Sequence, residues 1–181
     1  MAVYEEGARE WRARRGEATD GLGTVFRAAV GPGLVADLGC GTGRYFAEIG
    51  PPLVGLDATA AMLAFARDRG APLARGDLEA LPFRTGLLAG AFARHSYLHV
   101  PKGRVRPALG ELRRVIRPGG RALLSMIEGD YEGHALPDDD FPGRFFAFWT
   151  ADELVGALGG IGFTHLQTRA HRSGVVITAS C

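Results

Sequence analysis

Short apolar runs alternate with segments of helical periodicity along most of this 181-residue chain. The runs predict strands, because strands covered on both faces of a sheet are apolar throughout. They span residues 34–38, 53–56, 72–76, 87–93 and 122–127. Between them, apolar residues recur at three- and four-residue intervals, which predicts amphipathic helices. These span residues 44–49, 59–69 and 104–117. Strand–helix alternation of this kind predicts a doubly wound α/β sheet with helices on both faces.

The two ends of the chain depart from this alternation. Residues 1–30 mix charged and apolar side chains and predict a helical cover that ends at a Gly-Pro-Gly break. Near the other end, residues 164–171 and 175–179 predict two strands joined by a tight turn, so the last strand runs antiparallel. We therefore expect one domain over residues 1–181, with a mostly parallel, seven-stranded, Rossmann-like sheet.

A long irregular segment separates the fifth predicted strand from the last helix. Residues 128–150 are rich in Gly, Pro and Asp, and long loops in compact domains are usually functional, so we expect this segment to face the substrate. Thr150 and Glu153 have capping-box spacing and predict the start of the last helix. Three adjacent aspartates, residues 138–140, point in different directions in a loop, which predicts a solvated tip and no metal site.

Charge and composition narrow the class of partner. Lys and Arg number 21 against 20 Asp and Glu, a net charge of +1, which argues against attraction to nucleic acid or to a membrane surface. No run approaches the roughly 18–20 apolar residues of a membrane span, and the acidic N-terminus is unlike a secretory signal. The two cysteines, Cys40 and Cys181, have no metal-binding spacing. We expect a cytoplasmic protein with free thiols, and its oligomeric state stays open.

The strongest chemical signal follows the first predicted strand. Residues 37–43, Asp-Leu-Gly-Cys-Gly-Thr-Gly, place three glycines at alternate positions between a strand and a helix. Glycines there allow a tight turn and let a ligand approach the backbone, where a Cβ would collide. In a doubly wound sheet such a loop lies at the carboxyl edge, near the switch point where ligands bind.

A second acid is predicted at the same edge. Asp57 ends the next strand, 20 residues after Asp37 (57 − 37), and a carboxylate there can accept hydrogen bonds from ribose hydroxyls. The two features together predict a cofactor that contains a nucleoside. A dinucleotide fingerprint would need a small residue where Arg44 stands, and no Gly-Lys-Ser/Thr follows as it would in a P-loop.

These blocks resemble, in order, the motifs of the class I S-adenosylmethionine-dependent methyltransferases, and the resemblance covers nearly the whole chain. Residues 37–43 are similar to that family's glycine motif, and residues 76–83 to its third motif. Residues 96–100 and 112–120 look like the stretches after the fourth strand and before the fifth. One position departs, because the family often has an acid at the start of the fourth strand and residues 87–92 contain none. That departure bears on loop geometry more than on activity.

The resemblance implies S-adenosylmethionine as cofactor and assigns residues to it. In that family the acid after the second strand holds the ribose, an apolar side chain lies against adenine, and the third-motif acid reads the adenine edge. The matching residues here are Asp57, Met62 and Asp77. The full set implied for the cofactor is Asp37, Gly39, Cys40, Gly41, Gly43, Asp57, Ala58, Met62, Asp77, Leu78, Ala93 and Arg94.

The acceptor side of the site is less specified. Methyl transfer from a sulfonium is mainly a problem of orientation, and a general base is needed only if the acceptor arrives protonated. His99 and His95 follow the fourth strand and are the candidate catalytic residues, with a loop-anchoring role as the alternative. The candidates for acceptor contact are Tyr97, Glu128, Phe145 and Trp149.

The short cover favours a small-molecule acceptor that is methylated on oxygen or nitrogen. Two alternatives stay open. One is an RNA or protein acceptor, for which basic residues within 102–117 would line the binding face. The other is a noncatalytic partner protein that keeps the fold and binds S-adenosylmethionine without turnover.

Overall fold

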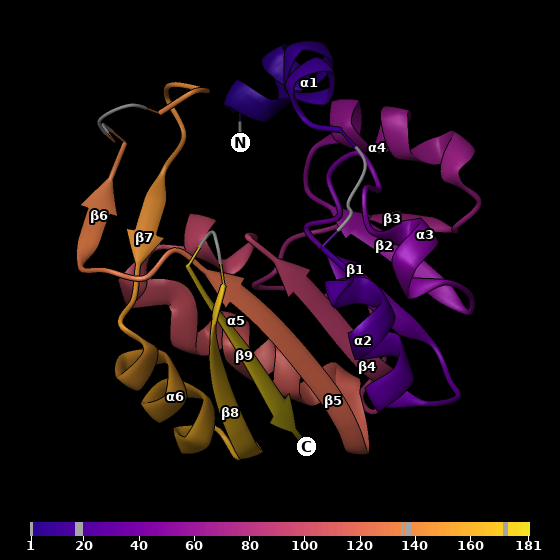
Figure 1. Ribbon diagram of the computed structural model, residues 1–181, viewed down its shortest axis with the longest axis vertical. Helices are drawn as coiled ribbons and strands as arrows, with labels where there is room; N and C mark the ends of the chain where they lie inside the picture. The colour runs from indigo at the N-terminus through magenta and orange to yellow at the C-terminus, as the bar shows by residue number, and fades with distance from the viewer. Residues whose placement is uncertain (1, 17–19, 135, 137–138, 172–173) are drawn as a thin grey trace.

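The computed structural model of the protein describes residues 2–16, 20–134, 136, 139–171 and 174–181. Its centre is a seven-stranded sheet with the strand order β3-β2-β1-β4-β5-β9-β8 (Figure 1). The strands of this sheet are β1 Val35–Leu38, β2 Leu53–Asp57, β3 Leu73–Arg75, β4 Leu88–Arg94, β5 Ile116–Met126, β8 Thr164–His171 and β9 Gly174–Ser180. All neighbours pair in parallel except β9, which is antiparallel to both β5 and β8. The predicted fold class is confirmed.

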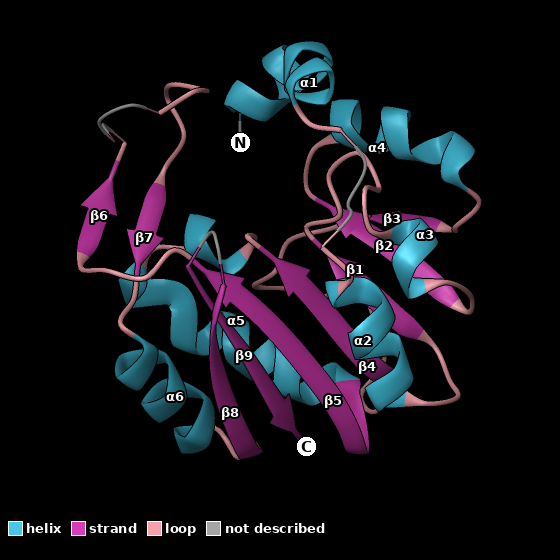
Figure 2. Cartoon of the chain, in the orientation of Figure 1, coloured by secondary structure: helices cyan, strands magenta, loops and turns pink. Residues whose placement is uncertain are grey.

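Helices cover both faces of the sheet, as Figure 2 shows. The helices are α1 Ala2–Arg14, α2 Leu22–Val30, α3 Phe46–Ile49, α4 Ala60–Ala66, α5 Lys102–Val115 and α6 Ala151–Gly160, with short 3₁₀ turns η1 Arg67–Arg69 and η2 Tyr97–His99. Alternate residues of a strand face opposite sides, so Val35 of β1 belongs to the same hydrophobic cluster as Phe26 of α2, while Leu38 belongs to the cluster that contains Leu112 of α5. The sheet therefore separates two hydrophobic clusters.

Helix α5 follows the predicted periodicity but ends earlier than predicted. Its apolar positions between Val105 and Val115 are fully buried, and each large one contributes about 1.5–3 kcal/mol through burial. The prediction carried the helix to residue 117, whereas Ile116 already pairs with Leu88 as the first residue of β5. The Gly119 N–H donates to the carbonyl of Cys181 at 2.8 Å, so pairing with a distant segment extends the strand through Pro-Gly-Gly.

The N-terminal segment divides into two helices with different roles. Helix α2 packs on one face of the sheet, where the rings of Phe26 and Phe92 lie 5.7 Å apart. Helix α1 instead packs against α4 and stands above the carboxyl ends of the parallel strands (Figure 1). Of the cover predicted over residues 1–30, the structure therefore places only α1 over the candidate site.

The segment 128–150 is less irregular than predicted. Its ends form β6 Tyr131–Gly133 and β7 Phe146–Phe148, which pair antiparallel as a separate two-stranded sheet. The sequence pattern, rich in glycines and acids, did not predict these two strands, because the pairing of three-residue strands depends on tertiary contacts rather than on propensity. The capping box is confirmed: Thr150 Oγ1 accepts from the Glu153 N–H at 3.2 Å, and a Glu153 carboxylate oxygen accepts from the Thr150 N–H at 2.9 Å.

This architecture gathers the strand ends β1, β2, β4 and β5 beneath α1 and the β6–β7 pair (Figure 1). Within the described residues, the helices are too short or too polar to cross a membrane.

Candidate functional site

A cavity of about 1110 Å³ opens at the carboxyl edge of the sheet. Pockets for single drug-sized ligands measure roughly 300–1,000 Å³, so this cavity has room for a nucleoside cofactor and an acceptor together. The predicted site residues on its wall are Asp37, Gly39, Cys40, Gly41, Asp57, Ala58, Met62, Asp77, Leu78, Arg94, His95, His99 and Phe145. The topology thus brings together residues separated by as much as 108 positions along the chain (145 − 37).

The glycine loop forms the floor of the cavity. Gly39 has a φ of +74°, and a Cβ on it would lie 2.4 Å from the Cβ of Ser96, so only glycine fits there. Gly41 has a φ of +54°, and a Cβ on it would meet no atom within 4 Å. A ligand can therefore approach the backbone at Gly41 without meeting a side chain.

Asp57 joins the glycine loop to the second strand. One carboxylate oxygen accepts from the Gly41 N–H and the other from the Thr59 N–H, each at 2.8 Å. The carboxylate is 8% exposed. Burial raises its pKa above the usual value, while the two backbone N–H groups oppose that rise. Each carboxylate oxygen has a second lone pair, so Asp57 can brace the loop and still accept from a ligand hydroxyl.

Asp37 is the more deeply buried acid of the pair. It is 2% exposed, and its Oδ2 atom has no hydrogen-bond partner among the described residues. Burial, together with the negative charge of Asp57, raises the pKa of Asp37 to about 8. A buried polar atom without a partner at a cavity wall is unusual and fits a ligand that supplies the missing hydrogen bond. Burial also raises the pKa of the neighbouring Cys40 thiol, which stays protonated.

The side of the cavity beyond β2 and β3 is lined by apolar residues and by two acids, Asp77 and Glu79. Met62 of α4 is almost fully buried and lines the wall with Leu78 and Ala58. Asp77 accepts from the Glu79 N–H at 3.0 Å, which shapes the turn after β3. Apolar side chains with a carboxylate beside them suit the adenine ring that the motif resemblance implies.

His99 ties three distant segments together. Its Nδ1 atom is 2.7 Å from the Phe145 carbonyl oxygen, so Nδ1 carries the proton and donates. Its Nε2 atom therefore accepts from the Tyr4 hydroxyl of α1 at 2.9 Å. Burial lowers the pKa of His99 to about 4, with Arg144 adding to the effect and the Phe145 carbonyl opposing it. The contacts match the loop-anchoring alternative for this histidine.

His95 lies beside a cation that keeps it neutral. Arg94 donates to His95 Nε2 and, at 2.8 Å, to the Ser125 hydroxyl. Burial first, and the Arg94 charge second, lower the pKa of His95 to about 3. Arg94 also donates to the Tyr45 hydroxyl at 3.1 Å and lies 3.5 Å from Asp20. Arg94 is therefore the centre of a polar cluster at the end of β4.

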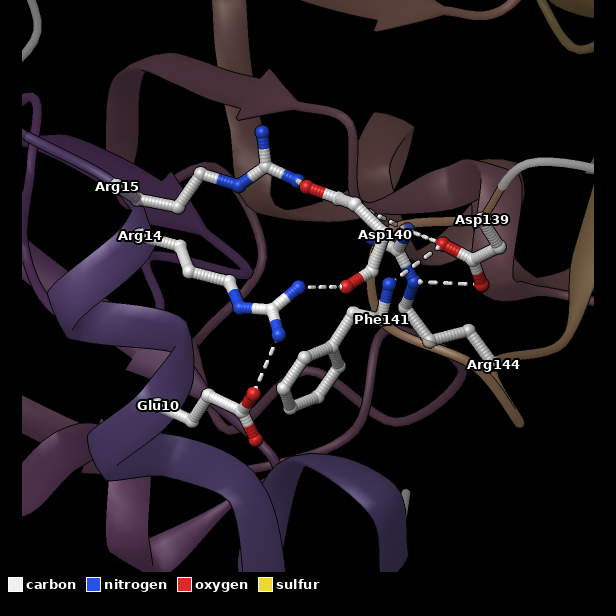
Figure 3. Close-up of polar contacts among 7 residues, drawn as sticks. All are labelled: Glu10, Arg14, Arg15, Asp139, Asp140, Phe141 and Arg144. Carbon is white, nitrogen blue, oxygen red and sulfur yellow. Dashed lines mark hydrogen bonds and ion pairs between the residues drawn. The ribbon is translucent and has the colours of Figure 1, made fainter.

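The segment 139–146, called the cover from here on, lines the cavity together with α1. The sequence did not predict the polar contacts of this segment. The rings of Tyr4 and Trp11 on α1 pack around Phe141, with centroids 5.3–6.0 Å apart. Asp139 pairs with Arg144 in the interior of the cover (Figure 3). The expectation of a solvated tip at residues 138–140 is wrong for Asp139, whose side chain is buried in its ion pair with Arg144, whereas Asp140 is exposed and pairs with Arg15. Residue 138 lies outside the described residues.

The cover also engages the basic residues of the N-terminal helix. Arg15 donates to both carboxylate oxygens of Asp140 at 2.9 and 2.6 Å, and Arg14 donates to the Asp140 backbone carbonyl (Figure 3). The cavity wall thus includes residues that no local motif marked, namely Tyr4, Trp11, Arg15, Asp20, Tyr45 and Arg144.

Five predicted site residues lie off the cavity. Tyr97, the first residue of η2, is 1% exposed and packs in the core, and Ala93 is buried within β4. Gly43 faces Phe46 and Arg69 on the far side of the loop, and a Cβ there would approach both at 2.9 Å. The last two, Glu128 and Trp149, pair with each other's backbone at the base of the β6–β7 sheet. Burial and strand pairing, which local sequence does not encode, direct these residues away from the site.

Among the described residues, no group of three or more His, Cys, Asp and Glu side chains is placed to hold a metal ion. The site is built from a glycine loop, two buried acids and a set of apolar side chains at the switch point of a doubly wound sheet. That combination defines a Rossmann-like protein that binds a nucleoside cofactor.

Known proteins that are similar to this chain also belong to the class of Rossmann-like proteins that bind a nucleoside cofactor. Residues 35–120 match the family model described as a methyltransferase domain. The malonyl-[acyl-carrier protein] O-methyltransferase of Salmonella typhimurium is 32% identical over 74% of this chain and 66% of its own length. The tRNA (carboxymethyluridine(34)-5-O)-methyltransferase of Mus musculus is 30% identical over 92% of this chain and 25% of its own.

A solved structure supports the fold. A methyltransferase from Thermotoga maritima, described as a possible histamine N-methyltransferase, has a TM-score of 0.72 and 18% identity over 99% of this chain and 98% of its own. The chain belongs to the class I S-adenosylmethionine-dependent methyltransferases, as the motif resemblance predicted. It spans between a quarter and two thirds of the length of the two curated relatives above.

Proposed function

We propose that the chain binds S-adenosylmethionine in the 1110 Å³ cavity and moves its methyl group to an oxygen or nitrogen atom of a small-molecule acceptor. The observation that carries the proposal is the hydrogen bond between the Gly41 N–H and Asp57. This bond holds the glycine loop against the acid at the end of β2, so the two form one continuous side of the cavity. The space next to Gly41 is open. The wall is suited to a ribose whose hydroxyls meet the carboxylate while its 5′ substituent runs along the loop.

The residues on the wall fit the rest of that cofactor. Met62 and Leu78 supply the apolar side chains for the adenine ring, with the Asp77 carboxylate beside them. The buried Oδ2 atom of Asp37 fits the ammonium group of the amino-acid tail, because an ammonium would supply both a hydrogen bond and a compensating charge. Bound S-adenosylmethionine supplies an electrophilic methyl carbon, and the chain contributes binding, orientation and the exclusion of water.

Neither predicted catalytic histidine, His95 or His99, fits the role of general base. Base catalysis needs a free imidazole lone pair near the acceptor. The lone pair of His99 Nε2 accepts from Tyr4, and that of His95 Nε2 accepts from Arg94. We assign His99 to anchoring the cover. An acceptor that needs neither of these two histidines is one whose lone pair is already available, such as a neutral amine or an ionised acid.

The cover favours a small acceptor. Helix α1 and the segment 139–146 both line the cavity and are joined by aromatic and ion-pair contacts, which narrows the space for an acceptor. The segment 128–150 contributes Phe145 to the wall, which supports its substrate-facing role. The relative from Mus musculus is named for a tRNA substrate, so tRNA belongs in the test as a competing acceptor.

Calorimetry with adenosylhomocysteine, followed by transfer assays with a labelled methyl donor, tests the proposal. Four kinds of acceptor are tested separately in the transfer assay: small amines, small acids, phenols and bulk tRNA. We expect saturable binding and label transfer to small molecules. Binding without transfer to any of these acceptors would favour the noncatalytic alternative, and transfer to tRNA alone would favour the RNA alternative. The absence of binding heat would refute the cofactor assignment itself.

A further inference from the structure

Arg15 brings an unused hydrogen-bond donor to the cavity wall. The residue follows α1, and its guanidinium stacks over the Trp11 ring at 4.6 Å. One terminal nitrogen, Nη2, donates to both oxygens of Asp140. The Nε–H group is buried, and among the described residues it has no hydrogen-bond partner. Arg15 therefore lines the cavity with a cationic edge only partly occupied by the cover (Figure 3).

The geometry of a guanidinium indicates what would complete this edge. Arginine has five N–H donors and grips carboxylates through two parallel hydrogen bonds. Of the Arg15 nitrogens, only Nη2 donates to Asp140, so the neighbouring Nε–H group remains to donate to a second anion. A buried N–H without a partner is unfavourable, and a ligand oxygen at that position would satisfy it.

A second orphaned atom lines the same cavity and has the opposite character. The Oδ2 atom of Asp37 is a buried acceptor without a partner among the described residues, whereas Arg15 Nε is a buried donor. A carboxylate and a guanidinium that each have a polar atom unpaired within the described part of the chain complement a zwitterion, whose ammonium suits Asp37 and whose carboxylate suits Arg15. A zwitterionic ligand supplies a donor for Asp37 and an acceptor for Arg15.

We propose that Arg15 is a carboxylate-binding residue of this cavity. Two sources share that chemistry: the amino-acid tail of the cofactor, and an acidic acceptor bound beside it. The inference rests on the proposed function, because it takes the cavity to be the cofactor site. It adds a consequence for the cover, since Arg15 also holds Asp140 and stacks on Trp11. A carboxylate bound at Arg15 links the ligand directly to the cover.

Calorimetry on two matched variants tests the proposal. Arg15→Gln removes the charged edge, and Arg14→Gln is the control, because Arg14 also bonds to Asp140 but is absent from the cavity wall. Both variants weaken the contact between α1 and the cover, but only the first alters the cavity. The probes are adenosylhomocysteine, 5′-methylthioadenosine, which lacks the amino-acid tail, and a set of small acids (malonate, succinate, benzoate) added to the adenosylhomocysteine complex.

If the carboxylate belongs to the cofactor tail, Arg15→Gln weakens adenosylhomocysteine binding roughly 10- to 100-fold. It leaves methylthioadenosine within about twofold, and Arg14→Gln leaves both nucleosides unchanged. If the carboxylate belongs to an acceptor, Arg15→Gln spares both nucleosides and abolishes the binding of at least one acid that binds the wild-type complex. Arg15→Lys, which keeps the charge but loses the paired donors, should recover only part of the affinity in either case.

Equal affinities of Arg15→Gln and wild type for every probe would overturn the proposal. An equal loss in Arg14→Gln would overturn it too, because that result assigns the effect to the cover alone. Melting curves of both variants exclude unfolding as the cause. Binding of methylthioadenosine to wild type checks the proposed function separately: if it binds while Arg15→Gln changes nothing, the cofactor assignment stands and the carboxylate assignment fails.

Discussion

Asp57 offers the sharpest test of the cofactor site, because its carboxylate has a structural role and a proposed ligand role. It accepts two backbone N–H groups, from Gly41 and Thr59, both at 2.8 Å. Hydrogen bonds to a charged group are worth about 1.5–3 kcal/mol each. Asp57→Ala removes both, together with the proposed ribose contacts. Asp57→Asn keeps one acceptor oxygen and the volume of the side chain.

We expect Asp57→Asn to weaken adenosylhomocysteine binding by about 1.5–3 kcal/mol, or roughly 10- to 150-fold, and Asp57→Ala to weaken it further. Both variants should also melt at a lower temperature than wild type, because the glycine loop loses a brace. Isothermal calorimetry and thermal melting separate the two effects.

Glu48 is a matched control for the structural part. Its carboxylate accepts two backbone N–H groups, from Gly21 at 3.2 Å and from Gly23 at 2.9 Å, but it is absent from the cavity wall. Glu48→Ala should therefore lower the melting temperature and leave adenosylhomocysteine affinity within about twofold. Wild-type affinity in Asp57→Ala, or an equal affinity loss in Glu48→Ala, would refute the reasoning.

Three further predictions follow from the same wall. The pKa of Asp37 is about 8 in the folded protein and 3.8 in the unfolded chain, so the stability of the ligand-free protein falls as pH rises between these values. Asp37→Asn should therefore melt at a higher temperature than wild type at pH 8 and at the same temperature at pH 4. A difference in melting temperature that does not depend on pH would contradict this. Gly39→Ala forces a Cβ to 2.4 Å from Ser96 and should lower the melting temperature more than Gly41→Ala, where the space is open; the reverse order would refute the packing argument. Because the pKa of His99 is lowered to about 4, His99 should contribute no step to kcat/KM between pH 5.5 and 8. A step near pH 6.5 that disappears in His99→Gln would restore the base assignment.

The sequence by itself determined the parts of this protein that are local. A buried strand, a glycine turn and a helix start are contiguous, so residues 37–43 identify the loop without knowledge of the rest of the fold. Asp57 could be assigned because one βα unit separates it from Asp37, and the length of that unit is nearly constant in doubly wound sheets. The capping box at Thr150 is likewise contained within four residues.

Only the tertiary structure decided how the site is covered and which side chains reach it. Arg15 meets Asp140, and Tyr4 meets His99, across more than 90 positions of sequence. Such contacts depend on how helices dock over a sheet edge, and that docking leaves no periodic trace in the chain. Tyr97 lies in a motif-like stretch yet is buried, because 3₁₀ geometry turns it toward the core. The glycine loop and the capping box each lie within a short segment, so the sequence alone determines them. The cover depends on contacts between distant segments, which only folding brings together.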